Sequence, residues 1–318
     1  MPMMKNNDKK PFRERFKEFT DPSYYQRVDD SHPMDIYIGR NSNYNYAIEI
    51  RGKFKYKSLK SSTFIRNRYF QYQGDDRLVL EISLTDDSLF ENFCILCEDL
   101  VDSSSLGSND EDCFTCIVNC YYRWRKLFQN KTRLLDESHI MGLIGELSFL
   151  KDYLFENLDY STAINSWSGW DMTHKDFSYD SLWYEIKAIS KGKSSVKISS
   201  IEQLTSDHLG FLVVFKLERM STSFDGISLN RLVTSILDML SDDEQKEEFL
   251  SKLAEVNFSF SSDYDAFVYS IYEVNSYIVE EDFPLLNRND IPSAIIKAQY
   301  ELNLADIEEF KSDLQYGA

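Results

Sequence analysis

The sequence lacks the segments that would place the protein in or across a membrane. No apolar run approaches the ~20 residues that a membrane-spanning helix needs. The stretch from Met1 to Arg15 is polar and of mixed charge, without the apolar core and cleavage site of a secretory signal. We therefore expect a cytoplasmic protein of bacterial type that has no membrane partner.

Several familiar catalytic signatures are also missing. The chain contains no Walker A loop, no Rossmann dinucleotide fingerprint and no nucleophile elbow. It has no internal repeat and no extended low-complexity segment. Only four histidines occur, and they are too scattered along the chain for a nuclease that binds its metal through histidine. They are His32, His139, His174 and His208.

The composition is that of a globular protein with an uneven distribution of charge. Of the 318 residues, 42% are hydrophobic and 14% are aromatic, which argues against disorder and allows a sizeable core. The formal net charge is -18, and residues 221–318 alone carry 20 acidic and 6 basic side chains. Most of the acidity therefore belongs to the C-terminal third.

One segment, residues 51–70, contains no acidic residue at all. In its first half lysines alternate with Phe54 and Tyr56, so a strand there would turn a row of ammonium groups to one face. A second acid-free basic run covers 121–133. Such runs suit a phosphate backbone, whose binding is driven by counterion release, although a solvated strand face or helix end has the same composition. The candidate DNA contacts are Lys53, Lys55, Lys57, Arg66, Arg68, Lys191 and Lys193.

All five cysteines fall in one window, as C-x2-C, 15 residues, C-x2-C and one further cysteine. This spacing fits a structural zinc template. The context favours core packing, because each pair lies on an apolar stripe of a predicted helix and neither encloses a Gly or Pro. An odd count gives no disulfide framework. We expect buried thiols and no structural zinc, and a zinc-dependent module stays the alternative. The cysteines are Cys94, Cys97, Cys113, Cys116 and Cys120.

The first half of the chain predicts a small antiparallel sheet followed by helices. After a polar lead-in to about residue 30, short alternating runs between 34 and 84 are separated by Gly, Asn and Asp, as is typical of strands. Helices are expected near 87–101 and 111–128, with a longer one over 137–157.

The second half predicts a mixed sheet flanked by helices. Its most apolar run, residues 210–218, is typical of a strand buried on both faces. Capping boxes are expected at Ser199 with Glu202 and at Ser241 with Glu244, where each would begin a helix. The other expected elements are two strand-like pieces between 175 and 190, a short strand at 195–199, helices at 228–240 and 242–255, a β-rich segment and a short last helix.

These elements predict an α+β fold in which a central mixed sheet is flanked by helices. We divide the chain into three segments: 1–110, an N-terminal β-rich region with a helix; 111–220, the mixed-sheet core; and 221–318, an acidic α/β C-terminal extension.

The pattern Asp or Glu, any residue, Lys occurs four times, and one copy lies in a predicted strand. Residues two apart in a strand project from the same face, whereas on a helix they point in different directions. The strand copy is Glu185 with Lys187, and Asp176 stands nine residues before Glu185. A hairpin turning near 179–181 would return Asp176 beside Glu185. The two carboxylates would repel each other unless a divalent cation binds them, and oxygen ligands suit Mg²⁺.

A third acid, Glu146, fits the same interpretation. It lies among apolar residues on the helical wheel of 137–157, so it points toward apolar surface. Gly142 and Gly145 cost that helix roughly 1 kcal/mol each relative to Ala, which suggests close approach to the strands. A rim carboxylate paired with a nearby lysine is the simpler alternative for Glu146.

Rival candidates are weaker. Asp171 lies further up the turn before the hairpin, and Asp180 falls at the hairpin tip, so we rank both below Asp176 as ligands. His174 could contact phosphate, but a solvated loop histidine explains it as well.

The motifs "GLIGE", "HKDF" and "YEIKA", followed by "ISSIEQL", together resemble the PD-(D/E)xK phosphodiesterase superfamily. More narrowly, the chain is similar to PD-(D/E)xK proteins encoded in bacterial restriction-modification and phage-defence operons. The similarity extends to "CYYRWRKLF", "EEDFPLL" and "IPSAIIKAQYEL". One departure is that Lys175 stands where the motif has Pro, which affects no ligand.

The resemblance implies a restriction-endonuclease-like core and Mg²⁺- or Mn²⁺-dependent hydrolysis of DNA. By position, Asp176 and Glu185 would be metal ligands together with the backbone carbonyl of Ile186. Lys187 would orient or help deprotonate the attacking water, and Glu146 would be an accessory acid. Gln203 resembles a supporting polar position of some relatives.

The partners implied are DNA and operon-encoded methyltransferase or ATPase/helicase subunits, and a homodimer is compatible with the fold. An alternative of a different class is a catalytically silent nuclease-fold module that binds DNA or a partner subunit, because the acidic C-terminal third would repel DNA.

Overall fold

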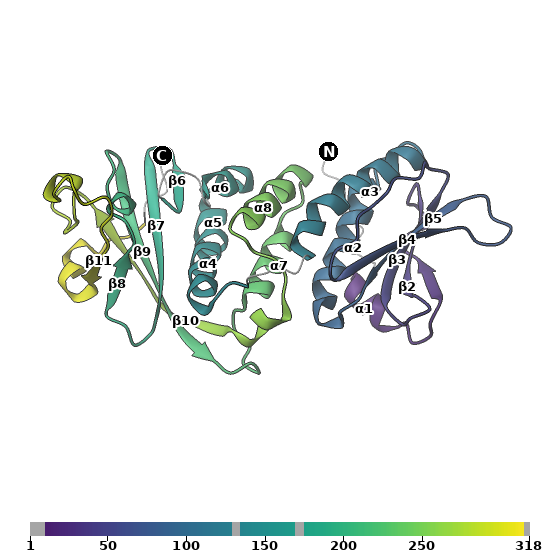
Figure 1. Ribbon diagram of the computed structural model, residues 1–318, viewed down its shortest axis with the longest axis horizontal. Helices are drawn as coiled ribbons and strands as arrows, with labels where there is room; N and C mark the ends of the chain where they lie inside the picture. The colour runs from purple at the N-terminus through teal and green to yellow at the C-terminus, as the bar shows by residue number, and fades with distance from the viewer. Residues whose placement is uncertain (1–9, 129–133, 169–174, 315–318) are drawn as a thin grey trace. The chain divides into compact units, whose positions relative to one another are not determined.

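The computed structural model describes residues 10–128, 134–168 and 175–314 (Figure 1). The chain forms two compact units. The N-terminal unit comprises Met1–Thr132 and Ser259–Ser262, and the C-terminal unit comprises Arg133–Phe258 and Asp263–Ala318.

A five-stranded antiparallel sheet forms the N-terminal unit together with helices on one of its sides (Figure 1). Isoleucines alternate along β2 and β3, where Ile38 pairs with Ile48, and Ile38, Ile48 and Ile50 are fully buried. The strand order is β1-β2-β3-β5-β4. The elements are α1 (Phe12–Lys17), β1 (Tyr24–Arg27), β2 (Asp35–Arg40), β3 (Tyr46–Gly52), β4 (Ile65–Phe70), β5 (Leu78–Leu84), η1 (Asp87–Leu89), α2 (Phe90–Ser104), α3 (Asp110–Arg125) and η2 (Lys126–Phe128).

The prediction of a strand in which Lys53, Lys55 and Lys57 alternate with aromatic residues is wrong. Strand β3 ends at Gly52, and the following residues form no regular element. The N–H of Lys53 donates to Asp110 Oδ2 at 2.6 Å and that of Lys55 to Glu111 Oε2 at 2.8 Å, so these donors are bonded to acids at the start of α3 instead of a neighbouring strand. Phe54 stacks on Phe114 of α3 with ring centroids 3.9 Å apart. Helix α1 and strands β1 and β4 were not predicted.

The C-terminal unit is built on a mixed four-stranded sheet in the order β10-β9-β7-β6. Strands β7 and β9 are parallel, and the outer pairs are antiparallel. Helices α4 and α5 lie on one side of the sheet, and the small β8–β11 sheet lies on the other (Figure 1). The strands are β6 (Phe177–Tyr179), β7 (Leu182–Ser190), β8 (Ser195–Ile198), β9 (Leu209–Met220), β10 (Val268–Val279) and β11 (Tyr300–Asn303).

The predicted long helix is present, with a π-helical turn in it. Helix α4 (Glu137–Phe149) continues through η3 (Leu150–Leu154) into α5 (Phe155–Asn157). The remaining helical elements of this unit are α6 (Tyr160–Ser166), η4 (Ile201–Gln203), α7 (Leu229–Met239), α8 (Asp243–Glu255), η5 (Ser262–Ala266), η6 (Arg288–Asp290) and η7 (Leu304–Phe310).

Neither predicted capping box of this unit forms. The N-cap of η4 is Ser200, whose side chain makes no capping hydrogen bond. The N-cap of α8 is Asp242, whose carboxylate accepts from the N–H groups of Glu244 and Gln245. Both helices therefore begin one residue later than predicted. The cap position of η4 is taken by Ser200, whose backbone is extended, and that of α8 is taken by the carboxylate of Asp242.

The two units differ from the three segments predicted from sequence. Helix α3 belongs to the N-terminal unit because it packs on α2. Strand β10, which lies within the predicted extension, belongs to the same sheet as the predicted core, because it pairs with β9. The α+β architecture with a central mixed sheet flanked by helices is confirmed.

Close approach of α4 to β7 rests on Gly145. A Cβ atom there would lie 3.2 Å from Cβ of Ala188 and 3.4 Å from Cγ2 of Ile186, which is tighter than ordinary packing. At Gly142 a Cβ would meet nothing within 4 Å. The predicted role in close approach therefore applies to Gly145 and not to Gly142.

We expect Gly145→Val to lower the free energy of unfolding by about 1–3 kcal/mol, because added methyl groups would overpack the contact with β7. Gly142→Val is the matched control, since it introduces the same residue into the same helix with open space around it. Urea unfolding of both variants checks this. An equal loss of stability at both positions would contradict a close contact at Gly145.

Candidate active site at the edge of strand β7

A two-residue turn brings Asp176 back beside Glu185. Asp180 and Ser181 have φ values of 44° and 68°, the left-handed backbone of the tight turns that connect hairpins. Phe177 pairs with Tyr184, and Tyr179 pairs with Leu182. Continuing this register by one position sets Asp176 opposite Glu185. The predicted hairpin is confirmed.

The short strand β6 leaves an edge of β7 for the Asp176 side chain. Strand β6 begins at Phe177, and just before it Asp176 Oδ2 accepts a hydrogen bond of 2.6 Å from the N–H of Ile186. The N–H and C=O of one residue in an extended strand point to the same side, so the Ile186 carbonyl faces this edge as well. A carboxylate and a main-chain carbonyl thus share the edge of the sheet.

Glu185 is completely buried, at 0% exposure. Its Oε1 accepts from the Lys187 ammonium at 2.6 Å, as the shared strand face predicts. Its Oε2 has no hydrogen-bond partner although it is buried. An orphaned carboxylate oxygen in a protein interior is costly, and a bound cation is one of the few ways to satisfy it.

Glu146 reaches the same place from α4. Its Oε2 accepts a 2.9 Å hydrogen bond from the indole N–H of Trp167, which follows α6. The Asp176 carboxylate and the Lys187 ammonium are its charged neighbours. The paired-lysine alternative does not describe this carboxylate, because its hydrogen bond comes from Trp167.

Burial and mutual repulsion dominate the electrostatics of these acids. Burial, followed by repulsion from Asp176, raises the pKa of Glu146 to about 8, and the same two causes raise the pKa of Glu185 to about 8. Burial raises the pKa of Asp176 as well, against the attraction of Lys187. Burial lowers the pKa of Lys187, but the carboxylates of Glu185 and Asp176 outweigh it and raise the pKa overall.

The donor set fits a hard divalent cation. Within the described residues, no group of three or more Asp, Glu, His or Cys side chains is placed so that it could hold a metal ion by itself. Mg²⁺ does not require such a group, since it is commonly held by one or two carboxylates, waters and substrate phosphate. The orphaned oxygen of Glu185 and the adjacent Asp176 carboxylate supply such a partial set.

Comparison with known proteins identifies the family. The family model described as "Putative PD-(D/E)XK family member" (DUF4420) matches residues 12–305. The chain belongs to this PD-(D/E)XK family. No curated protein and no solved structure matches it. Its fold is accordingly an α+β fold of the PD-(D/E)XK type, as the resemblance implied.

Within this PD-(D/E)XK chain, Gln203, which we predicted as a supporting residue, has a local contact. Its side-chain oxygen accepts from the N–H of Ser199 at 2.7 Å, so it ties down the loop after β8. Asp180 is exposed at the hairpin tip, as predicted. Asp171 and His174 lie outside the described residues.

Sequence reasoning missed two neighbours of the acids, Trp167 and Lys175. Trp167 fixes Glu146 as described above. Lys175, at the position of the family's proline, is buried and donates to main-chain carbonyls. Its signal was present in the sequence, because a lysine directly before a predicted buried acid needs partners of its own.

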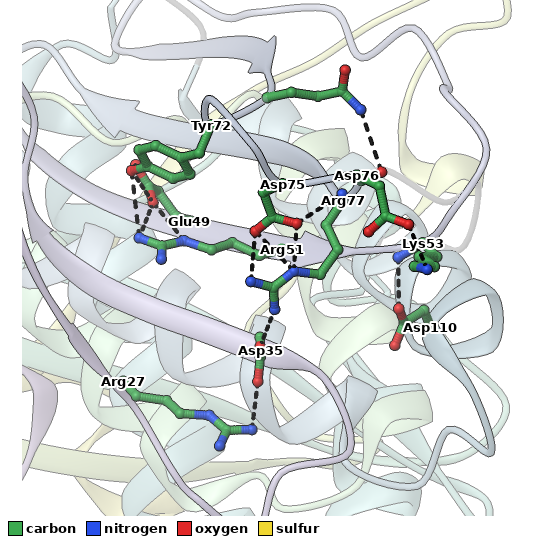
Figure 2. A network of polar contacts seen from close by, with 11 residues as sticks. Arg27, Asp35, Glu49, Arg51, Lys53, Tyr72, Asp75, Asp76, Arg77 and Asp110 are labelled. Atoms are coloured by element: carbon green, nitrogen blue, oxygen red, sulfur yellow. Dashed lines mark hydrogen bonds and ion pairs between the residues drawn. The ribbon is translucent and has the colours of Figure 1, made fainter.

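Several basic residues of the PD-(D/E)XK chain that we predicted as DNA contacts have acidic partners. Lys53 lies 2.6 Å from Asp76 (Figure 2), and Arg68 lies 2.6 Å from Glu81. Lys191 lies 3.0 Å from Glu218. The side chains of the other candidates are exposed; these are Lys55, Lys57, Arg66 and Lys193.

The five cysteines belong to α2 and α3 and are free thiols. Cys94, Cys97, Cys113 and Cys120 are buried, and burial raises the pKa of each. Cys120 donates to Asp99 Oδ2, and the same oxygen accepts from the indole N–H of Trp124.

In the described part of the chain, no helix has the length and apolar character needed to cross a membrane.

We expect Glu146→Gln to stabilise the metal-free protein at pH 8 by on the order of 4 kcal/mol and to leave its stability unchanged below pH 4.5. The folded protein holds a proton on Glu146 up to about pH 8, whereas the unfolded chain releases it near 4.5, so wild-type stability falls between these values. Glutamine keeps an acceptor for Trp167 and cannot ionise.

Thermal unfolding in chelator from pH 4 to pH 9 measures the difference. Glu137→Gln, at an exposed glutamate of the same helix, is the control. A constant difference between Glu146→Gln and wild type across this range would contradict the raised pKa.

Proposed function

We propose that the protein is a metal-dependent endonuclease that hydrolyses DNA phosphodiester bonds in bacterial restriction or phage defence. One observation carries the proposal: the Glu185–Lys187 pair, the Asp176 carboxylate and the Glu146 carboxylate meet at the edge of β7, where one buried carboxylate oxygen has no partner. A buried excess of acid at this position suits a cation and a phosphate.

Each residue has a distinct part in this proposal. Asp176 and Glu185 would hold the metal, with the Ile186 carbonyl on the same edge. Glu146 would act as an accessory acid, directly or through water, and Trp167 orients it. When bound, Mg²⁺ or Mn²⁺ polarises the phosphoryl oxygen and lowers the pKa of a bound water.

Lys187 supplies positive charge in this proposal. Its raised pKa keeps it an ammonium, so it orients the attacking water and stabilises the negative charge that develops on the phosphoryl oxygens. Its 2.6 Å contact with Glu185 fixes its position before substrate arrives. A preorganised cation of this kind costs no rearrangement during the reaction.

The exposed basic side chains are the proposed contacts to the DNA backbone. Lys193 follows β7 in the C-terminal unit, and Lys55, Lys57 and Arg66 belong to the N-terminal unit. Lys53, Arg68 and Lys191 would first have to exchange their acidic partners for phosphate. Operon-encoded methyltransferase or ATPase/helicase subunits and a second copy of the chain are proposed partners.

The acidity of residues 221–318 favours a second candidate function. A surface rich in acids suits a basic protein partner better than DNA, so a silent nuclease-fold module would bind a partner subunit. The two functions differ at Glu185 and Lys187, which a binding module does not need. Metal binding and cleavage therefore discriminate between them.

We expect the purified protein to cleave plasmid DNA in Mg²⁺ and Lys187→Ala to lose about 100-fold or more of this activity, because it lacks the cation that stabilises the transition state. Chelator should abolish cleavage by the wild type. Lys216→Ala is the matched control, since Lys216 lies on neighbouring β9 and forms a 2.7 Å ion pair with Glu273.

Gel analysis of supercoiled, nicked and linear plasmid gives the rates. Equal cleavage by wild type and Lys187→Ala would contradict the assigned role. Absence of both Mn²⁺ binding and cleavage of any plasmid tested would favour the silent module.

A further inference from the structure

Lys175 is a buried lysine whose ammonium is fully committed to main-chain carbonyls. The residue is only 8% exposed. Its Nζ donates to the carbonyl oxygens of Glu202 at 2.8 Å, Gln203 at 2.6 Å and Thr205 at 3.1 Å. An ammonium group has three donors, so all of them are used on one loop.

The aromatic ring of Trp183 completes the environment of this ammonium. Nζ lies 3.9 Å from the ring centroid, within the range of a cation–π contact. The indole N–H of Trp183 donates to the carbonyl of His208 at 2.9 Å. The ring fills the space next to Gly210 on β9. A Cβ atom added to this glycine would lie 1.8 Å from the nearest ring atom.

These contacts tie the loop between β8 and β9 to the hairpin that bears the acids. Lys175 bonds the loop at residues 202, 203 and 205, and Trp183 bonds it at 208. Lys175 directly precedes Asp176, just before β6 begins, and Trp183 lies on β7 two residues before Glu185. The loop therefore braces both strands next to the carboxylates.

The chemistry exceeds what packing alone requires. A buried ammonium loses its hydration, and a methionine of similar length would fill the same volume at lower cost. Three directional bonds from one atom fix the position of the Lys175 side chain. Because Asp176 is the next residue, its main chain is fixed as well, and the 2.6 Å bond to Ile186 then sets its carboxylate.

We propose that Lys175 is a positioning residue that holds Asp176 in the conformation that binds the metal, by clamping residues 202–205 against the hairpin. This inference rests on the proposed role of Asp176 as a ligand. Lys175 touches neither substrate nor metal in this arrangement and acts through the main chain of its neighbour.

The test is Lys175→Met, with Mn²⁺ as the probe. Isothermal titration calorimetry of the DNA-free protein should show Mn²⁺ binding weakened about 10-fold, and the Mg²⁺ concentration for half-maximal plasmid cleavage should rise by a similar factor. The cleavage rate at saturating Mg²⁺ should stay within a few-fold of wild type, because the ligands themselves remain. Lys216→Met, which removes an ion-paired lysine from β9, should leave both metal constants unchanged.

Unchanged Mn²⁺ affinity in a folded Lys175→Met, even with lowered stability, would overturn the inference and leave the proposed function intact. Absence of Mn²⁺ binding and cleavage in the wild type would overturn the proposed function itself. If Lys175→Met does not fold, Lys175→Gln keeps an amide donor and should show an intermediate loss of Mn²⁺ affinity. If neither variant folds, Lys175 is a scaffold residue and the inference is wrong.

Discussion

Three carboxylates share one desolvated edge of a β-strand, and the surrounding structure serves to hold them there. Asp176, Glu185 and Glu146 come from a turn, a strand and a helix, and burial raises the pKa of each. Separate devices fix each element: the Ile186 N–H bonds Asp176, Lys187 bonds Glu185 and Trp167 bonds Glu146. Burying these acids costs stability locally, a pattern that is common at functional sites.

The architecture explains why this edge is accessible to three elements at once. Strand β6 is only three residues long, so β7 has an unpaired edge beside Ile186. Side chains alternate along β7, which turns Glu185 and Lys187 to one face of the sheet while Ile186 and Ala188 pack under Gly145 of α4 on the other. Glu185 therefore reaches the edge from one face of the sheet, and Glu146 on α4 reaches it from the other.

Period-two alternation correctly predicted that Glu185 and Lys187 share one face of a strand, and it failed for the lysines after β3. In both segments charged and aromatic residues alternate, but Glu185 and Lys187 lie on a strand paired with β9, whereas Lys53 and Lys55 have their N–H groups bonded by acids of α3. Whether an alternating segment finds a strand partner depends on residues distant in the sequence, on β9 for Glu185 and Lys187 and at the start of α3 for Lys53 and Lys55. Local sequence does not contain that information, and the same applies to the Lys175 clamp and to the pairing of β10 with β9.

The balance of charge at the edge of β7 favours a cation together with an anion. Fully ionised, the three carboxylates exceed the ammonium groups of Lys187 and Lys175 by one negative charge. A divalent cation would reverse that to one positive charge, which matches the single negative charge of a phosphodiester. The acidity of residues 221–318 enters this balance little, because screening weakens charges beyond about 8–10 Å while the buried groups are close and poorly screened. The local set of charges, and not the net charge of the chain, therefore governs what this site can bind.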